Sequence, residues 1–441
     1  MKINKILIAN RGEIAVRIIR TCKEIGVKTV AVYSVADENS LHVKIADEAY
    51  CIGPAASNLS YLKKDNLIQI ALATKADAIH PGYGFLAEDA EFAQKCEDAG
   101  VLFIGPKAEH INLMGDKIAA RDTAVKAGVP IIEGIEGGEE NVQESDFPVL
   151  IKASAGGGGK GMRVVYEPSQ LKYAVQEAKT EAKAAFGNDA VYIERYIQNA
   201  RHVEVQVIAD SHGNVIHLGE RECSIQRRHQ KLLEESPCLF ITDKLRQKLH
   251  KDAVDLTSNI NYVNAGTIEF LVDIDRNKHY FIEMNTRIQV EHPVTEMVTG
   301  IDIVREQIRI SEGQRLSIEQ KDVNVSGHSI ESRINAEDPE NNFMPSPGLI
   351  EEYIAPGGLD VRVETFCHSG YTINPYYDSM VGKIIVKGNT REEAISKLKA
   401  TLETYYIKGI KTTIPLHLSI LNSEDFEKGD FNTKWLESVE L

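Results

Sequence analysis

HYFIEMNTRIQVE, residues 279–291, carries the densest group of chemically active side chains in this sequence. An extended strand points alternate side chains to one face, and here the alternate positions are polar: Glu283, Asn285, Arg287, Gln289 and Glu291. The intervening positions would then face a core: Ile282, Met284, Ile288 and Val290. Two carboxylates, two amides and a guanidinium on one face predict a divalent cation at one end and a small anion at the other.

A solvated edge strand is the alternative interpretation of this alternation. Asn is depleted in strands, and a solvated face usually carries Lys and Thr, so the composition favours a site. A second strand, Thr267–Val272, lies upstream across the polar run DIDRNKH, and a hairpin would place Glu269 beside Glu283. Two adjacent carboxylates repel each other without a cation between them, which predicts bound Mg²⁺ or Mn²⁺.

The composition sets limits on size, partners and location. A chain of 441 residues usually divides into two to four domains, and 43% apolar with 26% charged residues is typical of globular proteins. The net charge of −15 argues against nucleic-acid binding, which needs a local excess of Lys and Arg.

The cysteines and the apolar runs indicate a cytoplasmic protein. The six cysteines are scattered with no C-x-x-C pair, so we expect free thiols in a reducing compartment and neither a zinc knuckle nor a redox dithiol. The first apolar run is interrupted by Asn10 and Arg11, too early for a signal peptide, and no run of ~18 apolar residues predicts a membrane span.

The N-terminal pattern predicts a parallel α/β domain ending near residue 105. A strand at Lys5–Ala9, a helix at Ile14–Ile25 and a strand at Thr29–Tyr33 form a βαβ unit, which later strands extend: Ala49–Ile52, Ala76–Ile79 and Val101–Ile104. No G-x-G-x-x-G follows the first strand, so a dinucleotide is not indicated. The run 80–85, HPGYGF, follows the fourth strand at the edge where such sheets bind ligands, although a plain tight turn explains it equally well.

The middle of the chain, from Lys117 to about residue 312, has an α+β pattern. Strands Phe147–Ala153 and Met162–Tyr166 flank SAGGGGKG, whose four consecutive glycines cost more entropy than a hairpin requires. This run predicts a mobile flap whose backbone N–H groups close over phosphates, with a plain hairpin as the alternative. It is not a Walker loop, because Gly161 follows Lys160 where Ser or Thr belongs.

Further elements follow in order. Asp189–Ile197 and His202–Ala209 read as strands, and Val294–Ile310 as one amphipathic helix. The basic run 222–231 is either solvent-facing or an anion site. Beyond residue 325 the patterns predict a third region with these elements: strands Val361–Thr365 and Lys383–Lys387, and a helix at Glu392–Thr404.

Seven motifs, in order, give the chain a resemblance to a known family: IANRGEIAVRIIR (8–20), HPGYGFLAE (80–88), LMGDK (113–117), KASAGGGGKGMR (152–163), CSIQRRHQK (223–231), IEMNTRIQVEHPVTEM (282–297) and RINAEDP (333–339). Over nearly its whole length the sequence resembles biotin carboxylases of the ATP-grasp superfamily. The resemblance implies a Rossmann-like pre-ATP-grasp domain at 1–112, an ATP-grasp domain at 113–318 with a mobile lid at about 131–203, and a C-terminal mixed α/β domain at 325–441.

The resemblance also implies a reaction, in which ATP, bicarbonate and biotin give ADP, phosphate and carboxybiotin through carboxyphosphate. It assigns nucleotide binding to the following residues: Lys117, Lys152, Gly156, Gly157, Gly158, Gly159, Glu194, His202, Gln226 and His229. It assigns two metal sites to Glu269 and Glu283, with Asn285 nearby. The implied bicarbonate pocket comprises Lys231, Arg287, Gln289, Val290 and Glu291.

Four of these residues are the implied catalytic group: Lys231, Arg287, Glu291 and Arg333. Glu291 would deprotonate bicarbonate for attack on the γ-phosphorus, and Arg333 would stabilise the biotin enolate, with Tyr83 near that end of the site. The transferring phosphoryl group carries dispersed negative charge, which agrees with the cationic donors and metal ligands in these motifs.

The sequence ends at Leu441 without a Met-Lys-Met biotinylation site, so we expect biotin on a separate carrier protein. The expected assembly is that of acetyl-CoA carboxylase in fatty acid synthesis, with a biotin carboxyl carrier protein, carboxyltransferase subunits and a homodimer of this chain. The alternatives are a component of another acyl-CoA carboxylase, a different ATP-grasp ligase such as a purine-pathway carboxylase, and an inactive nucleotide-binding subunit. The last is disfavoured by five retained residues: Lys117, Lys152, Glu269, Glu283 and Glu291.

Overall fold

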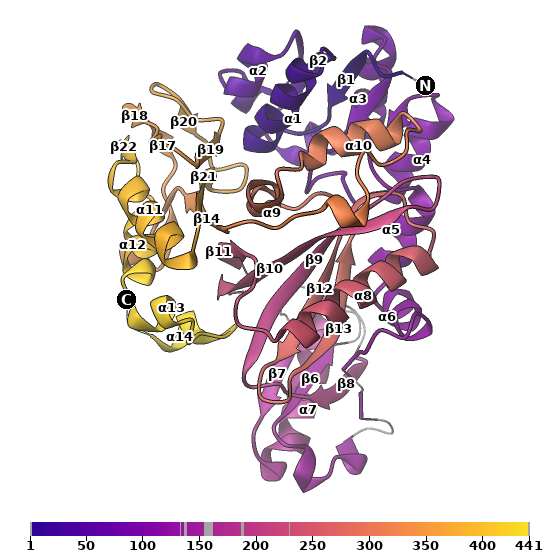
Figure 1. Ribbon diagram of the computed structural model, residues 1–441, viewed down its shortest axis with the longest axis vertical. Coiled ribbons are helices and arrows are strands. Elements are labelled where there is room, and N and C mark those ends of the chain that lie inside the picture. Colours follow the sequence, from indigo (N-terminus) through magenta and orange to yellow (C-terminus); the bar gives the residue numbers. More distant parts are fainter. Residues whose placement is uncertain are drawn as a thin grey trace.

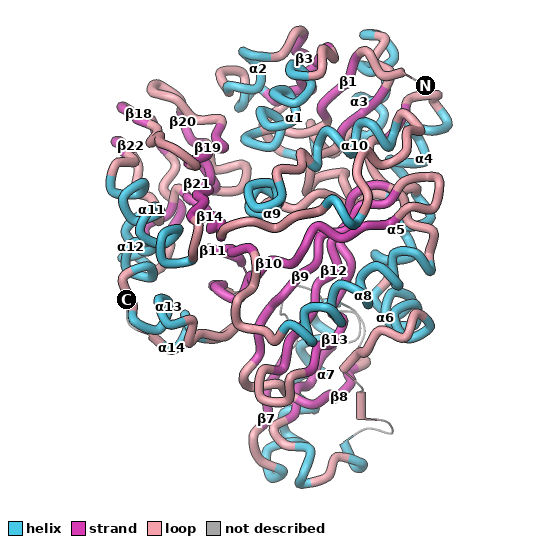
Figure 2. The backbone as a smooth tube through the Cα atoms, in the orientation of Figure 1, coloured by secondary structure: helices cyan, strands magenta, loops and turns pink. Residues whose placement is uncertain are grey.

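The computed structural model describes residues 2–132, 134–135, 139–153, 162–186, 189–228 and 230–439. An N-terminal α/β layer lies against one end of a large central sheet (Figure 1). A small sheet with one helix projects from the opposite end, and the C-terminal region lies along the side (Figure 2). The functional side chains come mainly from the central sheet, so its construction decides the site.

The N-terminal sheet is parallel throughout, with the strand order β3-β2-β1-β4-β5. Its strands are β1 Lys5–Ile8, β2 Lys28–Ser34, β3 Glu48–Gly53, β4 Ala78–His80 and β5 Leu102–Phe103. Its helices are α1 Gly12–Glu24, α2 Leu41–Ile45, α3 Lys64–Thr74, α4 Ala90–Asp98 and α5 Ala108–Gly115. The predicted βαβ unit is confirmed, because the apolar face of α1 packs with β1 in one buried cluster.

The central sheet is antiparallel and has the order β13-β12-β9-β10-β11-β14-β21-β19. Its strands are β9 Ala200–Ala209, β10 Val215–Arg227, β11 Gln230–Ser236, β12 Asn264–Asp273, β13 Lys278–Asn285, β14 His328–Asn335, β19 Val361–Thr365 and β21 Met380–Gly388. Helix α8 (Asp243–Asn259) begins at Thr242, whose hydroxyl accepts a hydrogen bond from the Leu245 N–H at 3.2 Å. Strands from the C-terminal region therefore continue the sheet of the middle region without a break.

The predicted helix Val294–Ile310 is wrong in its continuity, because the structure has two helices there. Helix α9 (His292–Thr299) ends at Gly300, which adopts a left-handed φ of 73°. Helix α10 (Ile303–Ser311) then starts at Asp302, whose carboxylate accepts a hydrogen bond from Arg305 N–H at 2.8 Å. Glycine at a helix C-terminus and Asp at the next N-cap are both strong local signals, and they override the apolar periodicity.

A separate three-stranded sheet, with the order β7-β6-β8, carries the long helix α7 (Pro168–Phe186). Its strands are β6 Val149–Ala153, β7 Met162–Val165 and β8 Val191–Arg195. One face of α7 packs on the sheet through Leu171, Val175 and Ala178. The predicted glycine flap, Gly156, Gly157, Gly158 and Gly159, lies outside the described residues.

In the C-terminal region α11 (Arg391–Glu403) packs beside β14 and β21 (Figure 1), and three more helices follow, of which the last lies beside β10: α12 Ile414–Leu421, α13 Glu424–Lys428 and α14 Trp435–Ser438. The predicted strand Val361–Thr365 is confirmed as β19, and the predicted helix corresponds to α11. A single buried cluster joins Ile330 and Ile334 of β14 to Leu398 of α11. In the part of the chain that the structure describes, no helix is long and apolar enough to span a bilayer.

Candidate active site

The hairpin of β12 and β13 brings Glu269 directly opposite Glu283, as predicted. The next pair in the register is Phe270 with Phe281, so Ile282 is an extra residue in a β-bulge. The bulge reverses the alternation, which leaves Ile282 39% exposed and Phe281 buried. The prediction that Ile282 faces a core is therefore wrong, whereas Met284 is buried as expected.

The strand ends at Asn285, and the backbone bends through residues 286–291 before α9 begins. The prediction of one extended polar face through Glu291 is therefore wrong. Gln289 and Glu291 are nevertheless buried, at 3% and 2% exposure, and Ile288 is fully buried. The 286–291 turn directs Gln289 and Glu291 back toward the centre of the sheet, where they meet residues of β10, β11, β12 and β14.

Lys231, the second residue of β11, is the centre of the site. Its ammonium nitrogen donates to Glu204 Oε2 at 2.6 Å, to Glu269 Oε1 at 3.1 Å and to Glu291 Oε1 at 2.6 Å. Burial lowers the pKa of Lys231, but the three carboxylates outweigh it and raise that pKa well above its usual value. A single buried cation thus balances part of the charge of three carboxylates.

Glu291 lies between Lys231 and a second cation, Arg333 of β14. The Arg333 guanidinium donates to Glu291 Oε2 at 2.9 Å, and through Nε to Glu234 Oε1 at 2.6 Å. Burial raises the pKa of Glu291, but Lys231, Arg333 and the nearby Arg221 outweigh it and hold the pKa well below its usual range. Glu291 is therefore an ionised carboxylate at neutral pH, able to accept a proton.

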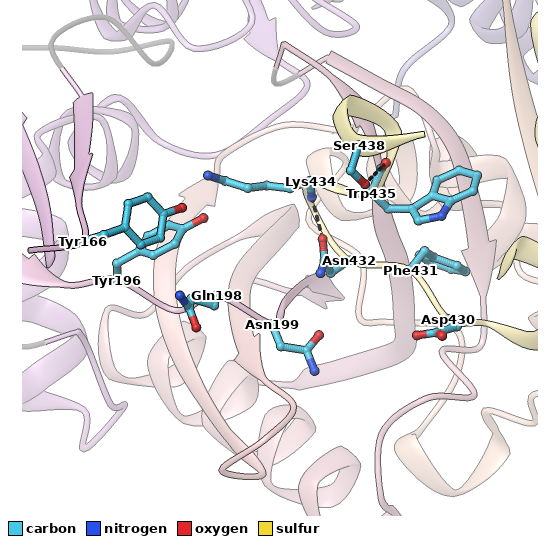
Figure 3. Close-up of a pocket in the computed structure, with 10 residues that line it drawn as sticks. All are labelled: Tyr166, Tyr196, Gln198, Asn199, Asp430, Phe431, Asn432, Lys434, Trp435 and Ser438. Carbon is cyan, nitrogen blue, oxygen red and sulfur yellow. Dashed lines mark hydrogen bonds between the residues drawn. The ribbon is translucent and has the colours of Figure 1, made fainter. Parts of the chain in front are cut away.

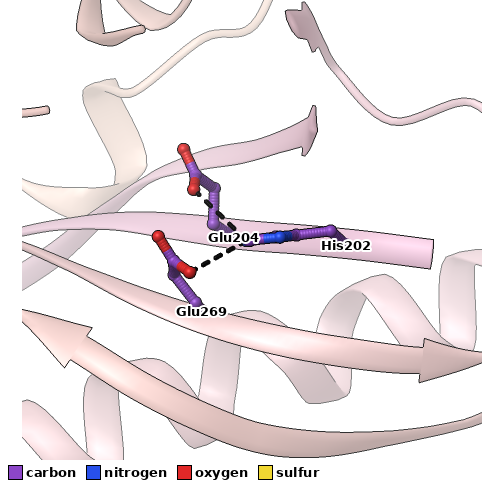
Figure 4. A group of neighbouring side chains, drawn as sticks. All are labelled: His202, Glu204 and Glu269. Atoms are coloured by element: carbon purple, nitrogen blue, oxygen red, sulfur yellow. Dashed lines mark ion pairs between the residues drawn. The ribbon is translucent and has the colours of Figure 1, made fainter. Parts of the chain in front are cut away.

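His202 extends the cluster along β9 (Figure 4). Its Nε2 lies 3.0 Å from Glu269 Oε2 and 3.8 Å from Glu204 Oε2. Its Nδ1 lies 2.9 Å from the side-chain amide nitrogen of Gln226, which also donates to the Cys223 carbonyl. Burial lowers the pKa of His202, and Glu269 more than compensates, so the pKa is raised.

The residues at the Glu269–Glu283 pair fit a divalent cation. Partial desolvation by the neighbouring protein and then the charge of Glu269 raise the pKa of Glu283, which is still exposed to solvent, while Lys117 opposes this change. Asn285 donates to Glu269 Oε1 at 2.9 Å, so its amide lies at the same pair. Two facing carboxylates repel each other when both are ionised. They offer oxygen ligands to Mg²⁺ or Mn²⁺, whose charge would compensate that repulsion.

The N-terminal domain contributes a residue that the sequence interpretation missed. Glu88 Oε2 accepts from Arg287 Nε at 2.8 Å, and Glu88 Oε1 accepts from the Thr286 N–H at 3.1 Å. Arg287 also donates to Asn285 Oδ1 at 2.9 Å. Glu88 ends the HPGYGFLAE motif, so the signal for it was present.

The remaining predicted residues lie at the edges of this cluster. Lys152 of β6 forms an ion pair with the fully buried Glu194 of β8, on the small sheet. Lys117 is the first residue of helix α6 (Lys117–Lys126), and its charge reaches Glu283. The Tyr83 hydroxyl donates to Glu13. His229 lies outside the described residues.

Arg221 of β10 was also missed, and it binds the members of the cluster together. Its side chain is fully buried. It donates to four further residues besides Glu204 (2.5 Å): Gln206 (2.8 Å), Thr295 (3.0 Å), Thr267 (3.2 Å) and Gln289 (2.7 Å). Its position in the strand run GERECSIQR gave the signal, because Arg221 and the apolar Cys223 lie two residues apart and so share one face of the strand.

Arg221→Met should lower the free energy of unfolding by about 3–5 kcal/mol, because it leaves buried Glu204 and its other hydrogen-bond acceptors without their donor. Equilibrium urea unfolding followed by circular dichroism measures the change. Arg305→Met is the matched control, since Arg305 pairs with the exposed Glu24 at 3.5 Å and should contribute below about 1 kcal/mol. Equal effects of the two substitutions would contradict this role for Arg221.

One cavity in the structure lies away from these residues (Figure 3). It has a volume of about 300 Å³ and is lined by residues of the small sheet's edge and the C-terminal segment, among them Tyr166, Tyr196, Lys434 and Trp435. None of the predicted site residues lines it. The cavity and the Lys231 cluster are therefore separate parts of the molecule.

Comparisons with known proteins agree over the full chain. Three family models match: "Biotin carboxylase, N-terminal domain" at residues 2–111, "Carbamoyl-phosphate synthase L chain, ATP binding domain" at 116–319, and "Biotin carboxylase C-terminal domain" at 331–438. Biotin carboxylase 1 of Bacillus subtilis is 55% identical over 446 residues, covering 100% of this chain and 99% of the relative.

Two further matches have other names. A pyruvate carboxylase component of Methanothermobacter thermautotrophicus is 51% identical over 441 residues, covering 98% of this chain and 89% of the relative. A solved structure of the biotin carboxylase domain dimer of Hydrogenobacter thermophilus 2-oxoglutarate carboxylase, with MgADP, ADP and bicarbonate, has a TM-score of 0.90 and 49% identity. It covers 99% of this chain and 98% of that chain.

The parallel N-terminal sheet, the small sheet over a large antiparallel one and the buried cationic cluster define a ligase of the ATP-grasp class. Within that class the matches are specific. The chain belongs to the biotin carboxylase family. It is an enzyme that uses ATP to carboxylate biotin.

Proposed function

We propose that this chain carboxylates biotin on a separate carrier protein, in the first half-reaction of acetyl-CoA carboxylase. The position of Glu291 between Lys231 and Arg333 carries the proposal, because it joins a proton acceptor to two anion-binding groups. Lys231 and Arg287 would hold bicarbonate, with Gln289 and the Val290 backbone beside it. Arg333 and Tyr83 would bind the biotin ureido group.

The proposed chemistry begins with a proton transfer. The bicarbonate hydroxyl donates to Glu291, the proton moves to the carboxylate, and the freed oxygen attacks the γ-phosphorus of ATP as ADP leaves. The negative charge of the transferring group needs cationic neighbours, which Lys117, Lys152 and Lys231 would supply. Carboxyphosphate then releases its carboxyl group as CO₂ together with phosphate, and the phosphate takes the N–H proton of biotin. Arg333 would stabilise the resulting biotin enolate while its nitrogen forms the bond to CO₂.

Glu269 and Glu283 would hold Mg²⁺, with Asn285 beside them, and their carboxylate oxygens would serve both of the two metal sites. The bound metal supplies positive charge to the β- and γ-phosphates. His202, Glu194, Gln226 and His229 would bind the nucleotide, and the glycine loop would serve as the flap over its phosphates. MgADP and bicarbonate in the solved 2-oxoglutarate carboxylase domain support this assignment.

Bicarbonate-dependent ADP formation stimulated by free biotin tests the activity with purified protein. Coupled spectrophotometry with and without bicarbonate should show ADP release only when bicarbonate is present, rising with biotin. Release that is independent of bicarbonate would contradict the proposal.

The choice of acyl acceptor needs its own experiment. Stand-alone relatives are named biotin carboxylases, and others are named pyruvate or 2-oxoglutarate carboxylase components. Capture on this chain of its biotinylated carrier, followed by transcarboxylation to acetyl-CoA, pyruvate or 2-oxoglutarate, distinguishes them. Transfer to acetyl-CoA alone is the expected result. Size-exclusion chromatography with light scattering should give a homodimer, as in the solved domain dimer.

A further inference from the structure

We infer that Lys383 is a positioning residue for the proposed general base, acting on the backbone of the 286–291 turn rather than on substrate. The inference rests on the function proposed above for Glu291. Lys383 lies on β21 in the C-terminal region, and its ammonium group donates to the carbonyl of Val290. That carbonyl directly precedes Glu291 in the chain.

The 286–291 turn is not part of a strand, so its carbonyls need other donors. The Gln289 carbonyl accepts from the His292 ring nitrogen at 2.8 Å, and the Glu291 carbonyl accepts from the Val294 N–H at 3.3 Å. Both of those donors come from the start of α9, only three residues along the chain. Lys383 provides the Val290 carbonyl with a donor from a distant strand, which fixes the turn to the sheet.

Lys383 has two partners that stabilise its buried charge, Glu13 and the Val290 carbonyl. Its side chain is fully buried, and an ammonium group in such a place is costly without partners. Glu13 of α1 lies 3.3 Å from its nitrogen, and the Tyr83 ring centre lies 6.0 Å from it. Lys383 of β21 thus links helix α1 to the 286–291 turn.

The same pair of strands supports Glu291 from two directions. Lys383 of β21 is paired directly with Arg333 of β14. Arg333 holds the Glu291 carboxylate at 2.9 Å, and Lys383 holds the preceding backbone carbonyl. Loss of Lys383 would free the backbone that aims the carboxylate, so that Glu291 moves relative to Lys231 and Arg333.

Buried Glu331 lies nearby and completes the electrostatic picture. Its two carboxylate oxygens have no hydrogen-bond partner among the described residues. Burial raises the pKa of Glu331 well above its usual value, and the charge of Lys383 opposes that increase. The direct partners of the Lys383 ammonium group are Glu13 and the Val290 carbonyl.

Lys383→Met tests the inference, since methionine keeps the volume and removes the donor. The turnover number for bicarbonate-dependent ADP formation should fall about 10–100-fold, the effect of misplacing a catalytic group by about 1 Å. The KM for ATP should stay within about twofold, because Lys117 and Lys152 are untouched. Lys387→Met is the matched control: it lies on the same strand, contacts Ser326 at 3.2 Å and should leave activity unchanged.

A pH profile separates positioning from general damage. Glu291 faces these charged or titratable groups: Lys231, Arg333, Arg221, Arg287, Glu234, Glu204, Glu269, Glu331 and Cys223. Displacement of Glu291 from the cations Lys231, Arg333 and Arg221 raises the pKa of Glu291. The acidic limb of the rate profile should therefore move up by about 0.5–1 pH unit in Lys383→Met. An unmoved acidic limb, or a turnover number within threefold of the unsubstituted enzyme, would overturn the inference.

Two controls keep the result interpretable. If Lys383→Met is not recovered folded, Lys383→Gln is measured in the same way, because its shorter neutral amide also cannot reach the Val290 carbonyl. The proposed base is tested independently by Glu291→Gln. Normal turnover in that variant would refute the role of Glu291 itself, whereas a loss there with no change in Lys383→Met refutes only the positioning role.

Discussion

Glu291→Gln should abolish bicarbonate-dependent ADP formation while nucleotide binding is retained. General bases contribute about 10²–10⁴-fold to rate, and glutamine has the same shape but cannot take a proton. Turnover measured with saturating ATP, bicarbonate and free biotin should fall by that factor. MgADP affinity, measured by isothermal titration calorimetry, should change less than about threefold.

The electrostatics of the site explain why the loss should be large. Lys231 at 2.6 Å and Arg333 at 2.9 Å hold the pKa of Glu291 well below its usual range. The carboxylate is therefore ionised throughout the neutral range, and activity should fall only as the pH drops through this lowered pKa. Since glutamine does not titrate, the residual activity of the variant should lack this acidic limb.

Glu340→Gln is the matched control for charge. Glu340 is 88% exposed in its side chain and lies 4.0 Å from Lys411, so its replacement should leave turnover unchanged. Retention of turnover within about tenfold in Glu291→Gln would count against a general-base role.

The local parts of this fold could be predicted from the sequence. The parallel N-terminal sheet follows from short apolar runs that alternate with helical periods, and the β12–β13 hairpin follows from two strands around a polar turn. Pairing of Glu269 with Glu283 needed nothing beyond that hairpin. The hairpin depends on contacts between residues close in sequence, and the elements of the parallel sheet depend on local periodicity.

Two errors came from assuming regular geometry. One extra residue at Ile282 shifts the neighbouring side chains to the other face, and residue patterns do not show where a bulge occurs. Gly300 and Asp302 did carry a readable stop-and-start signal, but apolar periodicity concealed it. A helix-breaking glycine followed by an N-cap residue deserves more weight than a continuous apolar stripe.

The centre of the site could not be predicted from local patterns. Lys231, Arg333 and Glu291 are brought together by pairing between β11 and β14, which lie about a hundred residues apart. Arg221 and Glu204 are buried by the same long-range contacts. The family resemblance indicated several of these residues, but the charge balance around Lys231 appears only in three dimensions.

Glu283→Gln should have the second largest effect, a loss of metal-dependent ATP cleavage. Glu283 faces Glu269 across the hairpin, and partial desolvation together with the charge of Glu269 raises the pKa of Glu283. Glutamine relieves that repulsion, so the protein itself should remain folded. It also removes a charged oxygen from the metal site, and carboxylate ligands dominate the affinity for Mg²⁺.

We expect half-saturation by Mg²⁺ to require at least about tenfold more metal, with a turnover number reduced at all concentrations, because the remaining ligands hold the ion less well. A Mg²⁺ titration of ADP formation at constant pH and constant free ATP gives both quantities.

Asp275→Asn, in the exposed turn of the same hairpin, is the matched control and should leave the titration unchanged. Because Glu283 and Glu291 lie at opposite ends of the cluster, the two losses should differ in kind: added Mg²⁺ should partly restore Glu283→Gln and have no effect on Glu291→Gln. An unchanged Mg²⁺ dependence in Glu283→Gln would exclude that residue as a ligand and leave Glu269 to hold the metal with groups from the nucleotide.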